Sequence, residues 1–394
     1  MRQPGLKVLA VGAVLAVSAL LAACDGEDRP TVDVIEDGTG SGTGSGSVSA
    51  SGTGSVSGSA SSSASGAPST GSAAGAYEPV SNVDVYFAMG ADLRDIRAIM
   101  QPATEGNAVD WDAASAIFED GLNQKRADGT VRALAEIPNE SVYAVFPNGA
   151  AVYGDADFIN DLIRAGLNGT GVAVGLSDNA RRQIVDKGIQ MLLYGKALQE
   201  MQAAKTRVVE GNTADADGAP HAVDEAYAAI AGPPADDGTL ANGLLATATS
   251  REGNFGLEGK LRAPLEQAFV DALEAAREGD ADAFEDAHTR VKGYMNGIFY
   301  LASLRYAGDL PGDESPEDRE VHLAEGGTFF QAIRALVASG SPEAEETIQA
   351  AYSRSPDEAF TEDLAQEVYD AMNDDAVLAA LELPGDLIVR TPPQ

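Results

Sequence analysis

Two of the three histidines in this chain stand three residues before an acidic residue. His221 precedes Asp224, which is followed by Glu225, and His322 precedes Glu325. On a helix, residues i and i+3 lie on one face, so each pair can direct an imidazole and a carboxylate toward one point. Imidazole and carboxylate together suit iron or manganese. The spacing therefore predicts that these five residues bind metal, at one shared site or at two.

The same pattern also has a purely structural explanation. Both pairs lie where an apolar helix is expected to begin, and carboxylates near a helix N-terminus are favoured without any ligand. Glu317 and Glu320, in the acidic loop expected before His322, are weaker candidate ligands that fit a solvated turn equally well. The third histidine, His288, follows Glu285 by three residues, and we expect it at a surface position of a helix. The two pairs can therefore be metal ligands or ordinary residues of a helix start, and both explanations stay open.

The segments that carry these residues are expected to be helical. From residue 83 onward, apolar residues recur at spacings of three and four, as in "SDNARRQIVDKGIQMLLYGKALQEMQAA" at 177–204 and "RAPLEQAFVDALEAAREG" at 262–279. Such segments begin at Ser, Asp or Pro and stop at Gly, and alanine is abundant. Alternating β-branched residues are nearly absent. The predicted fold class is all-α.

An internal repeat places the two histidine pairs in equivalent positions. "VDKGIQMLLYGKALQEM" at 185–201 and "RVKGYMNGIFYLASLRY" at 290–306 each open an apolar, aromatic helix with Lys-Gly. An acidic loop follows each helix, and then "HAVDEAYAAIAG" or "HLAEGGTFFQAIRALVASG". Because such self-similarity marks repeated structural units, we expect two duplicated helical-bundle halves, 77–245 and 246–394. They would form one large domain or two similar subdomains.

The N-terminal residues indicate export and a lipid anchor. Arg2 and Lys7 flank the start of an apolar run that ends in "LAAC", which is typical of a secretory signal peptide and resembles a bacterial lipoprotein box. We expect a signal peptide over 1–23, a lipidated Cys24 and a flexible Gly/Ser-rich tether within 24–76. No later apolar run is long enough to cross a bilayer. The sequence thus predicts an extracytoplasmic protein held at the membrane by lipid, in the periplasm or on the cell surface.

The charge balance narrows the possible partners. The chain has 61 acidic and 26 basic residues and a formal net charge of −35, which argues against nucleic acid and anionic membrane surfaces. Cations fit better, although the same acidity also serves solubility in salty surroundings. The sequence contains no phosphate-binding loop of the Walker type, no nucleophile elbow and no candidate cysteine nucleophile. We therefore expect no enzymatic activity.

Several stretches together resemble a known family. "VDWDAASAIFEDGLN", "KGIQMLLYGKALQEM", "APHAVDEAYAAIAG", "REGNFG" and "HLAEGGTFFQAI" occur in the order of the algal low-iron-inducible periplasmic proteins, also called iron-assimilating proteins, which have bacterial relatives. The resemblance runs from about residue 86 to 352. It implies a secreted helical protein that captures or retains iron outside the cell without being an enzyme. Both histidine pairs fall in the segments concerned.

A looser similarity points in the same direction. The imelysin-like iron-regulated lipoproteins are helical, duplicated and marked by a Gly-x-His-x-x-Glu motif. This chain has Gly218-Ala-Pro-His221-x-x-Asp224, which is one residue longer and has Asp in place of Glu. Both resemblances imply iron-linked uptake at the cell envelope.

Three functions compete on this evidence. The favoured hypothesis is a cell-envelope lipoprotein that binds iron, or another divalent cation, for storage or for delivery to an envelope transporter. A helical scaffold or interaction lipoprotein without metal is the main alternative. A ferritin-like di-iron enzyme uses two Glu-x-x-His helices and two further glutamates, and this chain has the reversed His-x-x-acid order twice. It is less favoured because both histidines are expected at helix starts beside polar loops and not in the middle of buried helices. Glu200 is one candidate for a glutamate that faces the pairs.

Overall fold

The computed structural model describes residues 77–392 except 138–144, 147–148 and 234–242. Cys24, the signal peptide and the tether lie outside the described residues. The α-helices are α1 (Asp84–Met100), α2 (Trp111–Asp120), α4 (Gly149–Tyr153), α5 (Phe158–Asn168), α6 (Asp178–Val209), α7 (Ala219–Ala231), α8 (Leu244–Phe255), α9 (Arg262–Glu278), α10 (Ala281–Asp309), α11 (Pro316–Gly340), α12 (Pro342–Tyr352), α13 (Glu362–Met372) and α14 (Asp375–Ala380). Short 3-10 turns are η2 (Gln101–Glu105), η3 (Leu134–Glu136), η4 (Gly171–Ala173), η5 (Leu310–Gly312) and η6 (Gly385–Leu387). The predicted all-α fold is confirmed.

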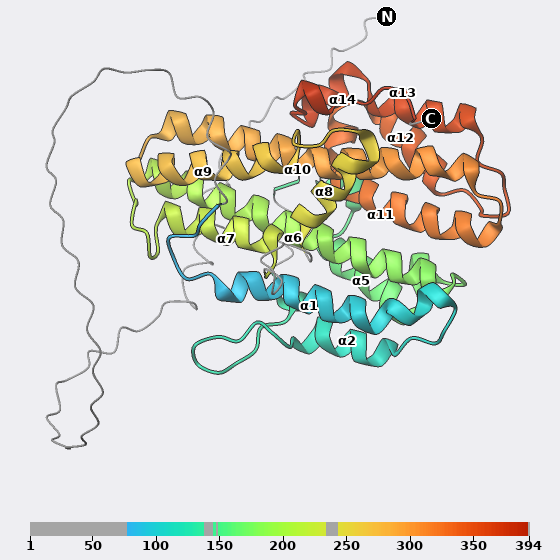
Figure 1. Ribbon diagram of the computed structural model, residues 1–394, viewed down its shortest axis with the longest axis horizontal. Helices are drawn as coiled ribbons and strands as arrows, with labels where there is room; N and C mark the ends of the chain where they lie inside the picture. The colour runs from blue at the N-terminus through green and yellow to red at the C-terminus, as the bar shows by residue number, and fades with distance from the viewer. Residues whose placement is uncertain (1–76, 138–144, 147–148, 234–242, 393–394) are drawn as a thin grey trace, which may run out of the picture. The chain divides into compact units, whose positions relative to one another are not determined.

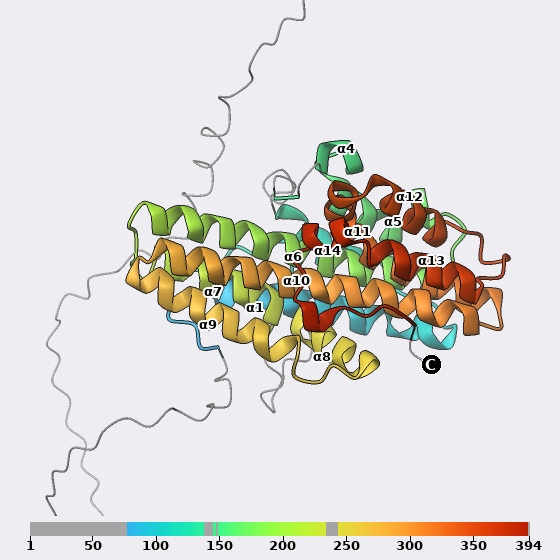
Figure 2. The same ribbon diagram turned by 90° about the horizontal axis from the view of Figure 1, so that it is seen from above.

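Two long helices, α6 and α10, run lengthwise through the molecule in both views (Figures 1 and 2). Each starts at a side chain that caps its first turn: Ser177 Oγ accepts from Ala180 N, and the Asp280 carboxylate accepts from Ala283 N. Both helices are buried around most of their circumference, as expected for helices at the centre of a bundle. They therefore form the axis of the bundle.

The shorter helices cover this axis on several sides. α7 packs along α6, α9 packs along α10, and α11 contacts both α6 and α10. α1 and α2 lie at one side of the bundle, and α12, α13 and α14 lie at the other (Figure 1). The tyrosines that recur at helical spacing, Tyr194, Tyr227, Tyr300 and Tyr306, are all buried in the core, as their spacing predicts.

The order of elements follows the repeat, but the packing does not confirm two duplicated halves. α6–α7 and α10–α11 are each a long helix, a loop and a second helix that carries a histidine. However, α11 of the second predicted half packs against α6 of the first, and α9 packs against α7. All described residues belong to one compact unit. The division at about residue 245 therefore stays a prediction.

The start of α11 corrects one prediction. Ser315 caps this helix by accepting from Asp318 N at 3.0 Å, and Pro316 is its first residue. Glu317 and Glu320 consequently lie in the helix and not in a loop, and His322 lies in its second turn. The helix begins earlier than expected because Ser followed by Pro is a strong start signal that outweighs the acidic character of the stretch.

The position of His288 also differs from its prediction. The prediction of a surface position is wrong, because α10 buries His288 so that only 5% of the residue is exposed. Its ring lies beside Phe284, with centroids 6.1 Å apart.

None of the described helices has the length and apolarity needed to span a membrane.

Candidate metal-binding site

α7 carries the first histidine pair. The helix begins after Gly218 with Ala219 and Pro220, whose fixed φ suits the first turn of a helix. His221 is therefore its third residue and lies at the N-terminal end. Nε2 of its ring is 3.1 Å from Glu225 Oε1, one turn further along. The side chains of His221 and Glu225 are thus in direct contact.

Asp224 faces a different neighbour, the segment 77–81 that precedes α1 and that we call the strap. The Asp224 carboxylate is fully buried and accepts four hydrogen bonds from the strap. The donors are Tyr77 OH at 2.6 Å, Val80 N at 2.9 Å, Ser81 N at 2.8 Å and Ser81 Oγ at 2.6 Å. Burial raises the pKa of Asp224, and these hydrogen bonds act in the opposite direction. The carboxylate therefore serves to dock the strap onto α7.

The strap also reaches His221. Ser81 Oγ lies 2.8 Å from His221 Nδ1 while it donates to Asp224. The spacing of three residues does direct imidazole and carboxylate toward one point, as predicted, and Ser81 Oγ occupies that point. The Tyr77 ring stacks on Tyr227 at a centroid distance of 4.1 Å, which fixes the other end of the strap on the same helix.

On the other side of His221 lies a largely buried group that we call the α6–α7 cluster: Tyr86 of α1, Lys196, Glu200, the half-buried His221 and Glu225. Lys196 Nζ is 2.5 Å from Glu200 Oε1, and Tyr86 OH donates to the same oxygen at 3.1 Å. Burial and the nearby charge of Glu200 raise the pKa of Glu225. Two carboxylates, a phenol, an imidazole and an ammonium are thus held together inside the bundle.

Sequence reasoning identified part of this cluster. His221 and Glu225 were predicted ligands, and Glu200 was a candidate facing glutamate. Tyr86 and Lys196 were missed. A signal for Lys196 does exist, because a lysine inside the apolar run "MLLYGKALQEM" needs a buried partner or a route to solvent.

The contact between His221 and Glu225 requires a proton between Nε2 and the carboxylate. Since Ser81 Oγ gives its hydrogen to Asp224, it is left to accept from Nδ1–H of His221. In the neutral ring Nε2 then carries a lone pair that faces the Glu225 carboxylate. Burial lowers the pKa of His221, but the hydrogen bond and the charge of Glu225 outweigh it, so that the pKa is raised. A proton between Nε2 and the Glu225 carboxylate therefore holds the contact together.

The second histidine pair does not converge. His322 Nδ1 lies 2.9 Å from the carboxylate of Asp313, in the turn before α11. Glu325 lies 3.0 Å from Lys187 Nζ on α6. Imidazole and carboxylate therefore serve separate partners, and their shared helix face does not bring them together.

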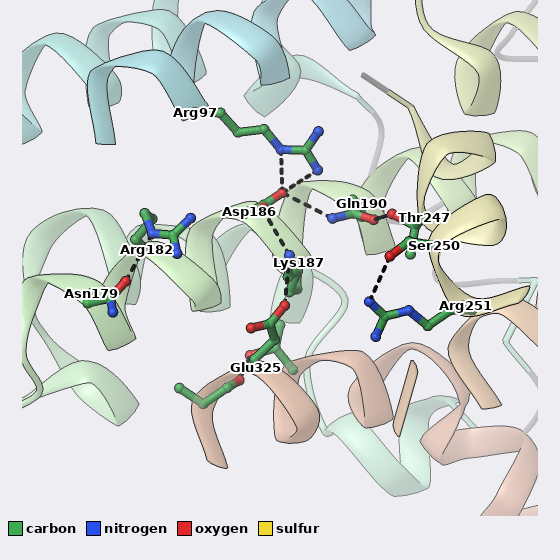
Figure 3. A network of polar contacts seen from close by, with 12 residues as sticks. Arg97, Asn179, Arg182, Asp186, Lys187, Gln190, Thr247, Ser250, Arg251 and Glu325 are labelled. Atoms are coloured by element: carbon green, nitrogen blue, oxygen red, sulfur yellow. Dashed lines mark hydrogen bonds and ion pairs between the residues drawn. The ribbon is translucent and has the colours of Figure 1, made fainter. Parts of the chain in front are cut away.

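The partner of Glu325 belongs to a polar network between α1, α6, α8 and α11 (Figure 3). Lys187 Nζ is also 3.0 Å from Asp186 Oδ2, and Arg97 Nε donates to Asp186 Oδ1 at 2.8 Å. Burial alone raises the pKa of Asp186, but Arg97 and Lys187 more than offset it and hold the pKa well below its usual range. Gln190 extends the network by donating to Asp186 at 3.0 Å. The positive charges of two side chains thus balance the negative charges of two others, namely Arg97 and Lys187 against Asp186 and Glu325.

The weaker candidates lie apart from both pairs. Glu320 Oε2 accepts from Ser177 N at 3.0 Å, at the start of α6. Glu317 lines an open cavity of about 560 Å³, together with Asp178 and Asp318. Carboxylates at two helix starts are favoured by the helix dipoles, so this acidic cavity is explained without a ligand.

Within the described parts of the chain, no group of three or more His, Cys, Asp and Glu side chains is already arranged to hold a metal ion. The α6–α7 cluster holds three such side chains and a phenol. Its ammonium occupies the charge-compensating position, however.

Comparison with known proteins places the chain in a family. A family model described as low iron-inducible periplasmic protein matches residues 51–309, more than half of the chain. The match contains the whole α6–α7 cluster and ends before His322 and Glu325. No curated protein and no solved structure matches the chain. The chain belongs to the low iron-inducible periplasmic protein family, as the order of its sequence stretches predicts.

Proposed function

We propose that this protein captures iron outside the cytoplasm, at the α6–α7 cluster, and retains it for uptake. The family description supports an iron-related role in the periplasm. The observation that carries the proposal is the 3.1 Å contact between His221 Nε2 and Glu225 Oε1 beside Glu200 and Tyr86. Imidazole, carboxylate and phenol oxygen together suit iron better than calcium or magnesium, which prefer oxygen alone.

Electrostatics supports a cation at this place. Glu200 and Glu225 are both buried and are close enough for the charge of one to raise the pKa of the other. Lys196 and the His221 proton balance them when no metal is bound. An iron ion supplies the same positive charge and releases the proton, so capture is expected to weaken as the pH falls.

The remaining parts of the proposal come from the sequence. A lipidated Cys24 would anchor the protein to the membrane, and the Gly/Ser-rich tether would present the folded part to an envelope transporter. The protein would be a binding and delivery protein and not an enzyme. Other divalent cations are competing ligands at the same residues.

The two alternatives make different demands. A di-iron enzyme needs two histidines and four glutamates in one bundle. The α6–α7 cluster offers one histidine and two glutamates, so nothing favours this alternative. A scaffold without metal needs no ion at His221, and binding measurements separate it from the capture function.

The test is a calorimetric titration of the lipidated full chain in detergent, stripped of metal, with ferrous and ferric iron, manganese, zinc and calcium. We expect iron binding that His221→Ala weakens at least about tenfold, as for other disturbed metal sites. His322→Ala is the matched control and should bind iron like the wild type. Equal binding by both variants, or none by the wild type, contradicts the proposal.

A spectroscopic measurement checks the phenol. A ferric ion bound to a phenolate absorbs visible light, so the ferric-loaded protein should be coloured. Tyr86→Phe should remove the colour, whereas Tyr294→Phe, at a partly exposed position on α10, should keep it. Colour that persists in Tyr86→Phe excludes Tyr86 as a ligand.

A further inference from the structure

We infer that Ser81 and Asp224 are positioning residues, which orient His221 for metal binding without contacting the metal. This inference rests on the proposed function and assigns a role to the strap within it. It also gives the His-x-x-Asp spacing a different meaning, because the carboxylate acts on the imidazole through the serine hydroxyl.

The first step is that Oδ2 of Asp224 can accept no further hydrogen bond. Oδ2 accepts from Val80 N, Ser81 N and Ser81 Oγ, and Oδ1 accepts from Tyr77 OH. A carboxylate offers about four lone-pair positions in all. The strap therefore fills Oδ2 and also bonds to Oδ1, so that a single lone pair of Oδ1 is left on a fully buried carboxylate.

The second step is the direction of the hydrogen bonds. Asp224 can only accept, so the Ser81 hydroxyl donates to it at 2.6 Å. The same hydroxyl lies 2.8 Å from His221 Nδ1 and accepts its hydrogen. This series of hydrogen bonds selects the His221 tautomer with hydrogen on Nδ1. The lone pair of Nε2 then points toward Glu225. Metal-binding histidines are commonly oriented in this way by a hydrogen bond at the other ring nitrogen.

The third step is that the strap is firmly held. The Tyr77 ring stacks on Tyr227 and contacts the edge of Phe269, with centroids 4.1 and 6.0 Å apart. Tyr77 is itself buried. Anchoring both ends of the strap on the α7 side fixes the position of Ser81, and hence the plane of the imidazole.

The first experiment needs no metal. Nitrogen NMR on the metal-free full chain, at a pH where the imidazole is neutral, reports which ring nitrogen of His221 carries the hydrogen. We expect Nδ1–H in the wild type, loss of this preference in Ser81→Ala, and its retention in Ser81→Thr, which keeps the hydroxyl. An unchanged tautomer in Ser81→Ala overturns the inference.

The second experiment measures iron affinity of the same proteins. Ser81→Ala should bind iron about 10–100-fold more weakly, the usual effect of removing such an orienting partner, and Ser81→Thr should recover most of the loss. Thr249→Ala on α8, which removes a hydroxyl bound only to its own helix and to Arg262, is the control. If the wild type binds iron and Ser81→Ala binds it equally well, only this inference fails. If the wild type binds no iron, the proposed function fails and this inference with it.

Discussion

Lys187 Nζ lies 3.0 Å from Glu325 Oε1 and 3.0 Å from Asp186 Oδ2, so that one buried ammonium joins α6 to α11. Glu325 is thus paired with Lys187, whereas His322 is paired with Asp313. It also links the two segments that the sequence assigns to different halves. The second histidine pair therefore contributes to the packing of the bundle through Glu325.

Breaking this contact should destabilise the protein strongly. Lys187→Met leaves the Glu325 carboxylate buried without its cation, and we expect the free energy of unfolding to fall by about 3–5 kcal/mol. Urea denaturation followed by circular dichroism measures it. The control is Lys292→Met, because Lys292 and Glu382 form a pair whose side chains are 32% and 36% exposed. That pair should contribute at most about 1 kcal/mol, and equal losses in both variants would contradict the assignment.

His288 should make stability depend on pH. Burial and the charge of Lys292 lower its pKa to about 4. In the unfolded chain a histidine takes up a proton near pH 6.5, so between about pH 6.5 and 4 the unfolded state binds more protons. Stability should therefore fall as the pH falls through this range, by up to about 3 kcal/mol.

Unfolding measured by urea between pH 7 and 4 tests this dependence. His288→Gln should flatten the profile over that range, because the titrating group is gone. An unchanged profile in His288→Gln would exclude His288 as the source.

Arg251 is a buried cation that the fold does not fully satisfy. Only 8% of the residue is exposed, and its Nε and Nη1 have no hydrogen-bond partner among the described residues. Its guanidinium lies over the Tyr306 ring, 5.5 Å from the centroid. Arg251→Met keeps the length of the side chain and removes the unsatisfied groups, so we expect the free energy of unfolding to rise by about 1–3 kcal/mol.

Thermal and urea unfolding measure the change. Arg262→Met is the control, since Arg262 is paired with Glu266 and partly exposed, and its removal should be neutral or slightly destabilising. A loss of stability in Arg251→Met would show that the contact with Tyr306 outweighs the unsatisfied donors.

The lipid anchor can be tested separately from the fold. Cys24→Ala should abolish incorporation of a labelled fatty acid and move the protein from the detergent phase to the aqueous phase on phase separation. Ser18→Ala, a conservative change within the apolar run before the predicted cleavage position, should keep the label. A labelled Cys24→Ala variant would reject the prediction that Cys24 is lipidated.

The helices could be predicted because their signals are local. Ser177 and the apolar residues that follow it suffice to indicate α6, and periodicity alone indicates the all-α class. The errors arose where local signals conflicted or were silent. At the start of α11, the acidic residues around Pro316 suggested a loop although Ser315 is the cap. His288 has polar sequence neighbours, and only the packing of α10 against other helices buries it.

The candidate site shows the same division. His221, Asp224 and Glu225 could be singled out by spacing, because the helix itself sets their relative positions. Ser81 could not, since it lies far from α7 in sequence and meets it only in the folded chain. The partners of a side chain, which decide its role, come from tertiary packing.

The strap has a mechanical consequence. It is the first described segment of the chain, so a force applied at Tyr77 along the chain is first borne by the contacts of the strap with α7. The load passes through the hydrogen bonds to Asp224 and the stacked ring of Tyr227, and only then into the helices. A force applied at Tyr77 therefore acts on Ser81, and through its hydrogen bond on His221, before it stretches α1.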